Sequence, residues 1–195
     1  MKNSIYFILL VALVGCSPTR YLKRAKAFIT MVPPIEIISH SPNPDPSTMD
    51  PMYYYDYFAN TISNALNEKG LNTIVDFPGM ERNSSEPNHL SIEIGMVHIE
   101  DLRMMGMVPN ALPAENPGQN MIKLTLIGGF SSVDKKGNSI SEGTNIQLEM
   151  GAETIAQMFE KDPNTDALKQ LLNTAAKDYS EEIMPLILKH LKANG

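Results

Sequence analysis

The chain has 195 residues, 43% of them hydrophobic and 19% charged, a balance that excludes a disordered chain and predicts one domain with its own core. Its net charge of −6 argues against a nucleic-acid partner, because phosphate binding depends on Lys and Arg. The single cysteine leaves no partner for an intramolecular disulfide.

The first sixteen residues have the layout of a secretory signal peptide. Lys2 gives a positive start, and the apolar run from Ile5 to Val14 is too short for a bilayer span of about 20 residues. The run closes with Leu13, Val14, Gly15 and Cys16, which resembles the bacterial lipobox. That resemblance implies removal of residues 1–15 and a diacylglycerol on the Cys16 thiol. The alternative is an ordinary signal peptide with an incidental cysteine.

Residues 16–34 are expected to form the lipidated N-terminus and a tether that ends in two prolines. Four basic residues gather there, either as headgroup contacts of about 1 kcal/mol each or as a solvated linker. They are Arg20, Lys23, Arg24 and Lys26. Because Ser17 rather than Asp follows the cysteine, the resemblance implies a position in the outer membrane, facing the periplasm.

The next elements predict a βαβ unit. Residues 35–38 are β-branched and predict a strand, and residues 41–51 hold four prolines and predict a loop. Asp50 and Pro51 are typical of a helix start and Gly70 of its end. A strand over 71–77 follows, so the two strands should be parallel.

The first turns of this helix carry four tyrosines. Tyr53 and Tyr57 share one side, while Tyr54 lies with Phe58, and Tyr55 falls between them. Such a cluster is either a binding wall or ordinary packing with polar ring tips.

Residues 101–120 are rich in Pro and Gly, yet apolar, in a loop unusually long for a compact domain. We expect this loop, together with the wetter face of the sheet, to bind a partner protein. The alternatives are Cu(I) binding by the methionine thioethers and packing onto the core. The candidate residues are Leu102, Met104, Met105, Met107, Val108 and Leu112.

The remaining pattern predicts strands over 90–99, 121–133 and 139–150, with a bulge or bend at Gly128 and Gly129 and a hairpin turn over 134–138. A short helix over 152–161 precedes a long helix that should start at Asp162 and kink at Pro185. Residues 35–195 should therefore form a single α+β domain. Its expected architecture is a two-layer sandwich, with two long helices on one face of a mostly antiparallel sheet of about five strands.

No catalytic motif stands out. Of the four histidines, His40 and His190 are isolated, and His89, Glu93 and His98 converge on one metal only if their strand is bulged. The sequence has no Gly-x-Ser-x-Gly nucleophile elbow. We therefore expect no enzymatic activity, no metal site and no cofactor.

With this element order behind a lipobox, the chain is similar to the lipopolysaccharide-assembly lipoproteins and related small envelope-assembly lipoproteins. The resemblance implies a non-enzymatic accessory in envelope assembly or secretion, anchored in the membrane by its N-terminal lipid and bound to an envelope protein. The alternative is a lipid or glycolipid carrier that holds its ligand between helices and sheet.

Overall fold

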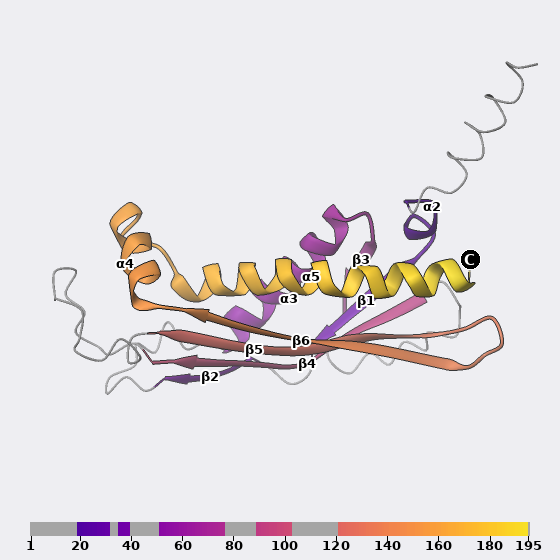
Figure 1. Cartoon of the computed structure of the whole chain (residues 1–195), viewed down its shortest axis with the longest axis horizontal. Coiled ribbons are helices and arrows are strands. Elements are labelled where there is room, and N and C mark those ends of the chain that lie inside the picture. Colours follow the sequence, from indigo (N-terminus) through magenta and orange to yellow (C-terminus); the bar gives the residue numbers. More distant parts are fainter. Residues whose placement is uncertain (1–18, 32–34, 40–50, 77–88, 103–120, 195) are drawn as a thin grey trace, which may run out of the picture.

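A layer of helices covers one face of a six-stranded sheet (Figure 1). This arrangement confirms the predicted α+β two-layer fold. The computed structural model describes residues 19–31, 35–39, 51–76, 89–102 and 121–194. The elements are α2 (Thr19–Leu22), β1 (Lys26–Met31), β2 (Glu36–Ser39), α3 (Pro51–Glu68), β3 (Asn72–Val75), β4 (His89–Asp101), β5 (Ile122–Val133), β6 (Ser139–Met150), α4 (Ala152–Lys161) and α5 (Ala167–Asn194).

The strand order is β3-β1-β4-β5-β6, and β2 pairs with β4 beside this path. Strand β1 is parallel to both β3 and β4, whereas β4, β5 and β6 form antiparallel pairs. Helix α3 packs on β1 and β3, and α5 packs on β5 and β6. No described helix is long and apolar enough to cross a membrane.

The expectation that residues 16–34 form only a tether is wrong, because part of this range is strand β1. Residues 26–31 are a strand between β3 and β4, and Ala27, Ile29 and Met31 are buried. Buried residues alternate with partly exposed ones, as in a half-buried strand, and the neighbouring charges and prolines obscured this pattern. Leu22 of α2 is also buried, so the folded body begins well before residue 35.

The βαβ unit exists, but with a different first strand. The parallel partner of β3 is β1, and α3 lies between them in the chain. Strand β2, the first strand of the predicted unit, pairs with the far half of β4, so it runs parallel to β3, as expected, without being its neighbour. The predicted limits of α3 hold, because Gly70 adopts a φ of 90° after its last turn.

Two adjacent glycines of β5 lie where a Cβ would clash with the neighbouring strands β4 and β6. A Cβ on Gly128 would lie 2.9 Å from Ile94 Cδ1, and one on Gly129 would lie 2.5 Å from the Glu142 carbonyl oxygen. The predicted bulge is present, but on the facing strand, where the register shifts between Ile94 and Met96. As a result Val97, rather than Met96, points into the core.

Helix α5 begins at Ala167, not at Asp162. The Asp162 side chain instead accepts a bond from the Asn164 amide (3.0 Å) in the turn after α4, and Asp166 accepts one from the Lys169 amide (3.1 Å). The helix continues past Pro185, which is exposed.

Side chains fill the space between the helices and the sheet. Phe58, Ile62, Leu172, Tyr179 and Ile183 are all 2% exposed or less. Burial raises the pKa of Tyr179, so its hydroxyl stays neutral. A carrier that held a lipid in this layer would have to displace these residues.

Candidate functional site

The elongated body has two ends of different chemistry (Figure 1). We call residues 19–26, 68–72, 89–91, 131–142 and 187–194 the α2 end. We call residues 36–39, 51–57, 100–102, 121–123 and 148–173 the α4 end.

The segment predicted to bind a partner leaves and re-enters the body at the α4 end. Its first residue with a described position, Leu102, donates its amide to the Met121 carbonyl (2.9 Å). This bond extends the β4–β5 pairing by one step, so both ends of the segment are held at the tip of these two strands. Met104, Met105, Met107, Val108 and Leu112 lie outside the described residues, as do Leu13, Val14, Gly15 and Cys16, and their roles stay predictions.

The tyrosine cluster ties α3 to the rest of the α4 end. Tyr54 donates to Asp166 Oδ2 (3.1 Å), Tyr57 to Asn173 Oδ1 (2.8 Å) and Tyr55 to the Met31 carbonyl (3.0 Å). The first two bonds reach α5 and its N-cap, and the third reaches β1. These three hydroxyls therefore serve internal packing, the second of the two readings of the cluster.

Tyr53 is the outward member of the cluster. It is 48% exposed and makes an edge contact with Tyr54, with ring centroids 5.3 Å apart. The ammonium group of Lys169 lies 4.7 Å from the Tyr53 ring and 5.2 Å from the Tyr57 ring, and its hydrogen bond with Tyr53 raises the pKa of Lys169. Lys169 thus keeps its charge over an aromatic surface.

Further apolar side chains are exposed at the same end. Met52 precedes the tyrosines and is 59% exposed, Phe159 on α4 is 37% exposed, and Ile38 on β2 is 38% exposed. Sequence reasoning selected the tyrosines and the loop but missed Phe159, which lies beside Met158 in the amphipathic helix α4. The α4 end therefore presents several apolar side chains to solvent.

The bulge in β4 puts His98 on the same face of the strand as Glu93, which is the arrangement that a shared metal site would need. It places His98 on the outward side, where Nδ1 lies 3.0 Å from Glu36 Oε2. Within the described part of the chain, no three potential metal ligands gather. His98 instead links β2 to β4, a contact that sequence reasoning missed because the pairing of β2 is non-local.

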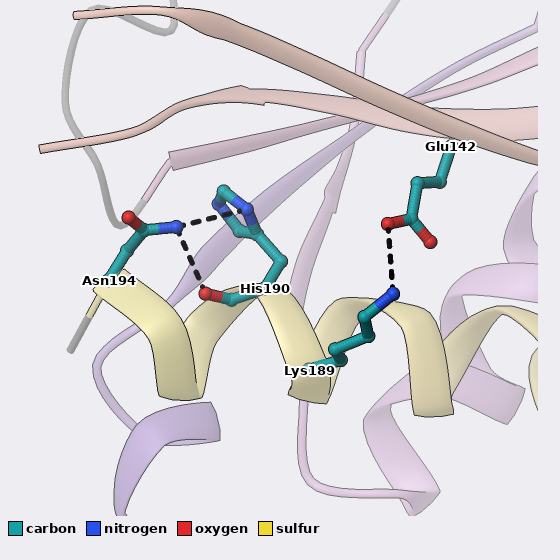
Figure 2. A network of polar contacts seen from close by, with 4 residues as sticks. All are labelled: Glu142, Lys189, His190 and Asn194. Atoms are coloured by element: carbon teal, nitrogen blue, oxygen red, sulfur yellow. Dashed lines mark hydrogen bonds and ion pairs between the residues drawn. The ribbon is translucent and has the colours of Figure 1, made fainter. Parts of the chain in front are cut away.

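His190 is buried at the α2 end (Figure 2). The Asn194 side-chain amide lies 3.2 Å from its Nδ1, which makes Nδ1 the acceptor and places the proton on Nε2. No described residue accepts a bond from Nε2. Burial lowers the pKa of His190, and the nearby carboxylates of Glu142 and Asp134 act in the opposite direction. The ring is therefore held neutral.

The N-terminal basic residues lie on the surface of the α2 end. Arg20, Lys23, Arg24 and Lys26 are all exposed, so nothing in the described body withdraws them from solvent. Their side chains flank Leu22 and Ala25, which are buried. Residues 20–26 therefore pack on the body through Leu22 and Ala25 and expose their basic side chains, rather than forming a free linker.

Comparison with known proteins yields distant likenesses. No family model and no curated protein matches the chain. Among solved structures, the chain is similar to the minor lipoprotein from Acinetobacter baumannii, with 10% identity and a TM-score of 0.40 over 82% of this chain and 91% of that one. Rare lipoprotein B from Shewanella oneidensis shares 10% identity, with a TM-score of 0.39 over 86% of this chain and 98% of that one.

A protein from Xanthomonas campestris shares 12% identity, with a TM-score of 0.38 over 90% of each chain. Scores this low carry no argument about activity or partners. The function of this chain has to be inferred from its own residues.

Proposed function

We propose that the chain is a lipid-anchored accessory protein of the bacterial envelope, without enzymatic activity. Cys16 would carry the acyl anchor in the outer membrane, with the body facing the periplasm and the α4 end binding an envelope protein. The observation that carries this proposal is the shortness of the link between the lipobox and the fold. Leu22 is already buried in the body, so only six steps of chain separate it from Cys16.

That link limits how far the body can lie from the membrane. Six residues span at most about 20 Å when fully extended. An acylated Cys16 would therefore hold the α2 end close to the leaflet and leave little freedom to diffuse away from it.

The length of the body supports binding at the opposite end. Helix α5 has 28 residues, which corresponds to about 42 Å at 1.5 Å per residue, and it runs from the α4 end to the α2 end. With one end tethered, the α4 end can reach a partner well beyond the leaflet. The exposed Met52, Tyr53 and Phe159 give that end apolar side chains suited to a protein contact.

The anchor is tested by metabolic labelling with palmitate in a Gram-negative host. The chain should incorporate the label and fractionate with the outer membrane, and the Cys16→Ala variant should lose the label. Label that persists in the Cys16→Ala variant would contradict acylation at this residue.

The partner site is tested by photo-crosslinking of the full-length, lipidated chain in envelope membranes. A crosslinker in place of Phe159 should capture a defined envelope protein, because Phe159 is exposed at the α4 end. The matched control is Ile127, which is 44% exposed on the sheet face opposite α5 and should capture little of that protein. Deletion of residues 104–118 should weaken the capture while the circular dichroism spectrum stays unchanged. Equal capture from both positions would reject the α4 end as the partner site.

Phe159→Ser should also leave the fold intact. A side chain that is 37% exposed contributes little to the core, so we expect a change below about 0.5 kcal/mol in the free energy of unfolding. Urea denaturation measures this change. A large loss of stability would mean that Phe159 packs the fold rather than contacts a partner.

A further inference from the structure

Positive charge gathers at the α2 end from segments far apart in the sequence. Besides the four N-terminal basic residues, this end carries five exposed lysines: Lys69 after α3, Lys135 and Lys136 in the β5–β6 turn, and Lys189 and Lys192 in the last turns of α5. It holds three acidic residues. The rest of the described body holds four basic and fourteen acidic residues. The molecule therefore has a strong separation of charge along its length.

Three contacts bring these segments together. Lys26 at the start of β1 pairs in register with His89 of β4, and the Ser132 hydroxyl donates to the His89 carbonyl (2.8 Å) just before the β5–β6 turn. The His190 ring of α5 lies 5.7 Å from the ring of Phe130. The N-terminal cluster, the turn and the end of α5 thus form one end of the body (Figure 1).

Two of the three acidic groups at this end, Asp134 and Glu142, are engaged in local contacts, and the third, Glu68, is exposed. Asp134 accepts bonds from the amides of Lys136 and Asn138, both 2.8 Å, which shape the turn and direct its lysine side chains outward. Glu142 lies 3.8 Å from Lys189 Nζ (Figure 2). The surface that remains is dominated by positive charge.

We propose that the α2 end is a second, electrostatic membrane contact that docks on anionic phospholipid headgroups and stands the body upright, with the α4 end away from the leaflet. This inference rests on the proposed lipid anchor and deepens it. An anchor alone fixes one point and leaves the body free to tilt. The lysines of the turn and of α5 add contacts that the anchor cannot supply, and the short link brings them close to the range of headgroup charge, about 8 Å at physiological salt.

The test uses the full-length, lipidated protein in vesicles of phosphatidylethanolamine and phosphatidylglycerol at 3:1, and in vesicles of phosphatidylcholine. Cys16 is the only cysteine and is acylated in this preparation, so Ser139→Cys and Glu160→Cys each give a single dye site. Energy transfer to a lipid-borne acceptor then reports the height of each end. With phosphatidylglycerol, the Ser139 site should transfer strongly and the Glu160 site weakly.

Charge removal makes the test specific. Each basic residue lost should lower the ratio of docked to undocked protein about fivefold, so Lys136→Gln with Lys192→Gln should lower it about 25-fold. The matched control is Lys161→Gln with Lys177→Gln, which removes the same charge outside the α2 end and should change nothing. One molar salt should abolish docking while the protein stays on the vesicles.

Two results would overturn the proposal. One is equal transfer from both dye sites in both kinds of vesicle, and the other is an equal response to the two lysine pairs. A preference for an acidic protein in the envelope over phosphatidylglycerol vesicles would assign the basic end to a different partner. Failure of the anchor is distinguishable, because an unacylated chain would not float with phosphatidylcholine vesicles but would still bind phosphatidylglycerol at low salt.

Discussion

The α2 end and the α4 end share one sheet but are built by opposite means. At the α4 end, tyrosine hydroxyls join α3 to α5 and β1, and apolar side chains remain exposed. At the α2 end, polar contacts form the β5–β6 turn, the neutral ring of His190 is buried, and nine basic side chains are exposed. The same two-layer fold therefore keeps exposed apolar side chains at one end and exposed basic side chains at the other.

The largest effect is expected where the two ends are joined, at the centre of β5. Gly129→Ala would place a Cβ 2.5 Å from the Glu142 backbone oxygen, so β5 and β6 must move apart. We expect a loss of about 3 kcal/mol in the free energy of unfolding, measured by urea denaturation. The control is Gly95→Ala, whose Cβ would meet its nearest neighbour, the Ile127 oxygen, at 3.8 Å and should cost little. Equal losses for both would mean that backbone freedom, not close approach, selects these glycines.

A smaller loss of stability is expected when one tyrosine hydroxyl of the α4 end is removed. Tyr55→Phe removes the donor to the buried Met31 carbonyl (3.0 Å) and should cost about 2 kcal/mol, since that carbonyl is left without a partner. Burial raises the pKa of Tyr55, so its hydroxyl remains a donor across the neutral range. Tyr21→Phe is the control, because no hydrogen bond of its hydroxyl is found in the described part of the chain. Chemical denaturation compares them, and a Tyr55→Phe variant as stable as Tyr21→Phe would show that the bond is not needed.

The smallest effect concerns pH and should appear at the α2 end alone. Burial holds the pKa of His190 below its unfolded value of about 6.5, so the unfolded chain takes up a proton that the native chain refuses. Stability should therefore fall as pH drops through about 6.5. His190→Gln should flatten this decline, and hydrogen exchange should localise the loosening at pH 5.5 to the last turns of α5. If stability falls with pH just as much in the His190→Gln variant, other titrating groups cause the decline.

The sequence predicted most elements because their signals are local. Pro51 and Gly70 mark the limits of α3, and the bonds within Asp134–Asn138 form the turn from residues at most four positions apart. The start of α5 was misplaced because Asp162-Pro163 has the chemistry of a helix start. In the structure Asp166 takes that place, where it accepts bonds from the Lys169 amide and from the Tyr54 hydroxyl of α3. The alternation of apolar and polar residues in β1 is visible in the sequence, but the charged residues beside it favoured the interpretation as a tether.

Local patterns in the sequence specify most of the helices, strands and turns, the two-layer class that these elements require, and the predicted lipobox with its basic flank. Tertiary structure decided which strands pair, and with that the place of β1 between β3 and β4 and the contact of His98 with Glu36. It also decided that lysines from the β5–β6 turn and from α5 join the N-terminal cluster at one end. Caps and turns depend on neighbours in the chain, whereas strand register depends on hydrogen bonds and packing between distant segments, and no local pattern encodes that choice.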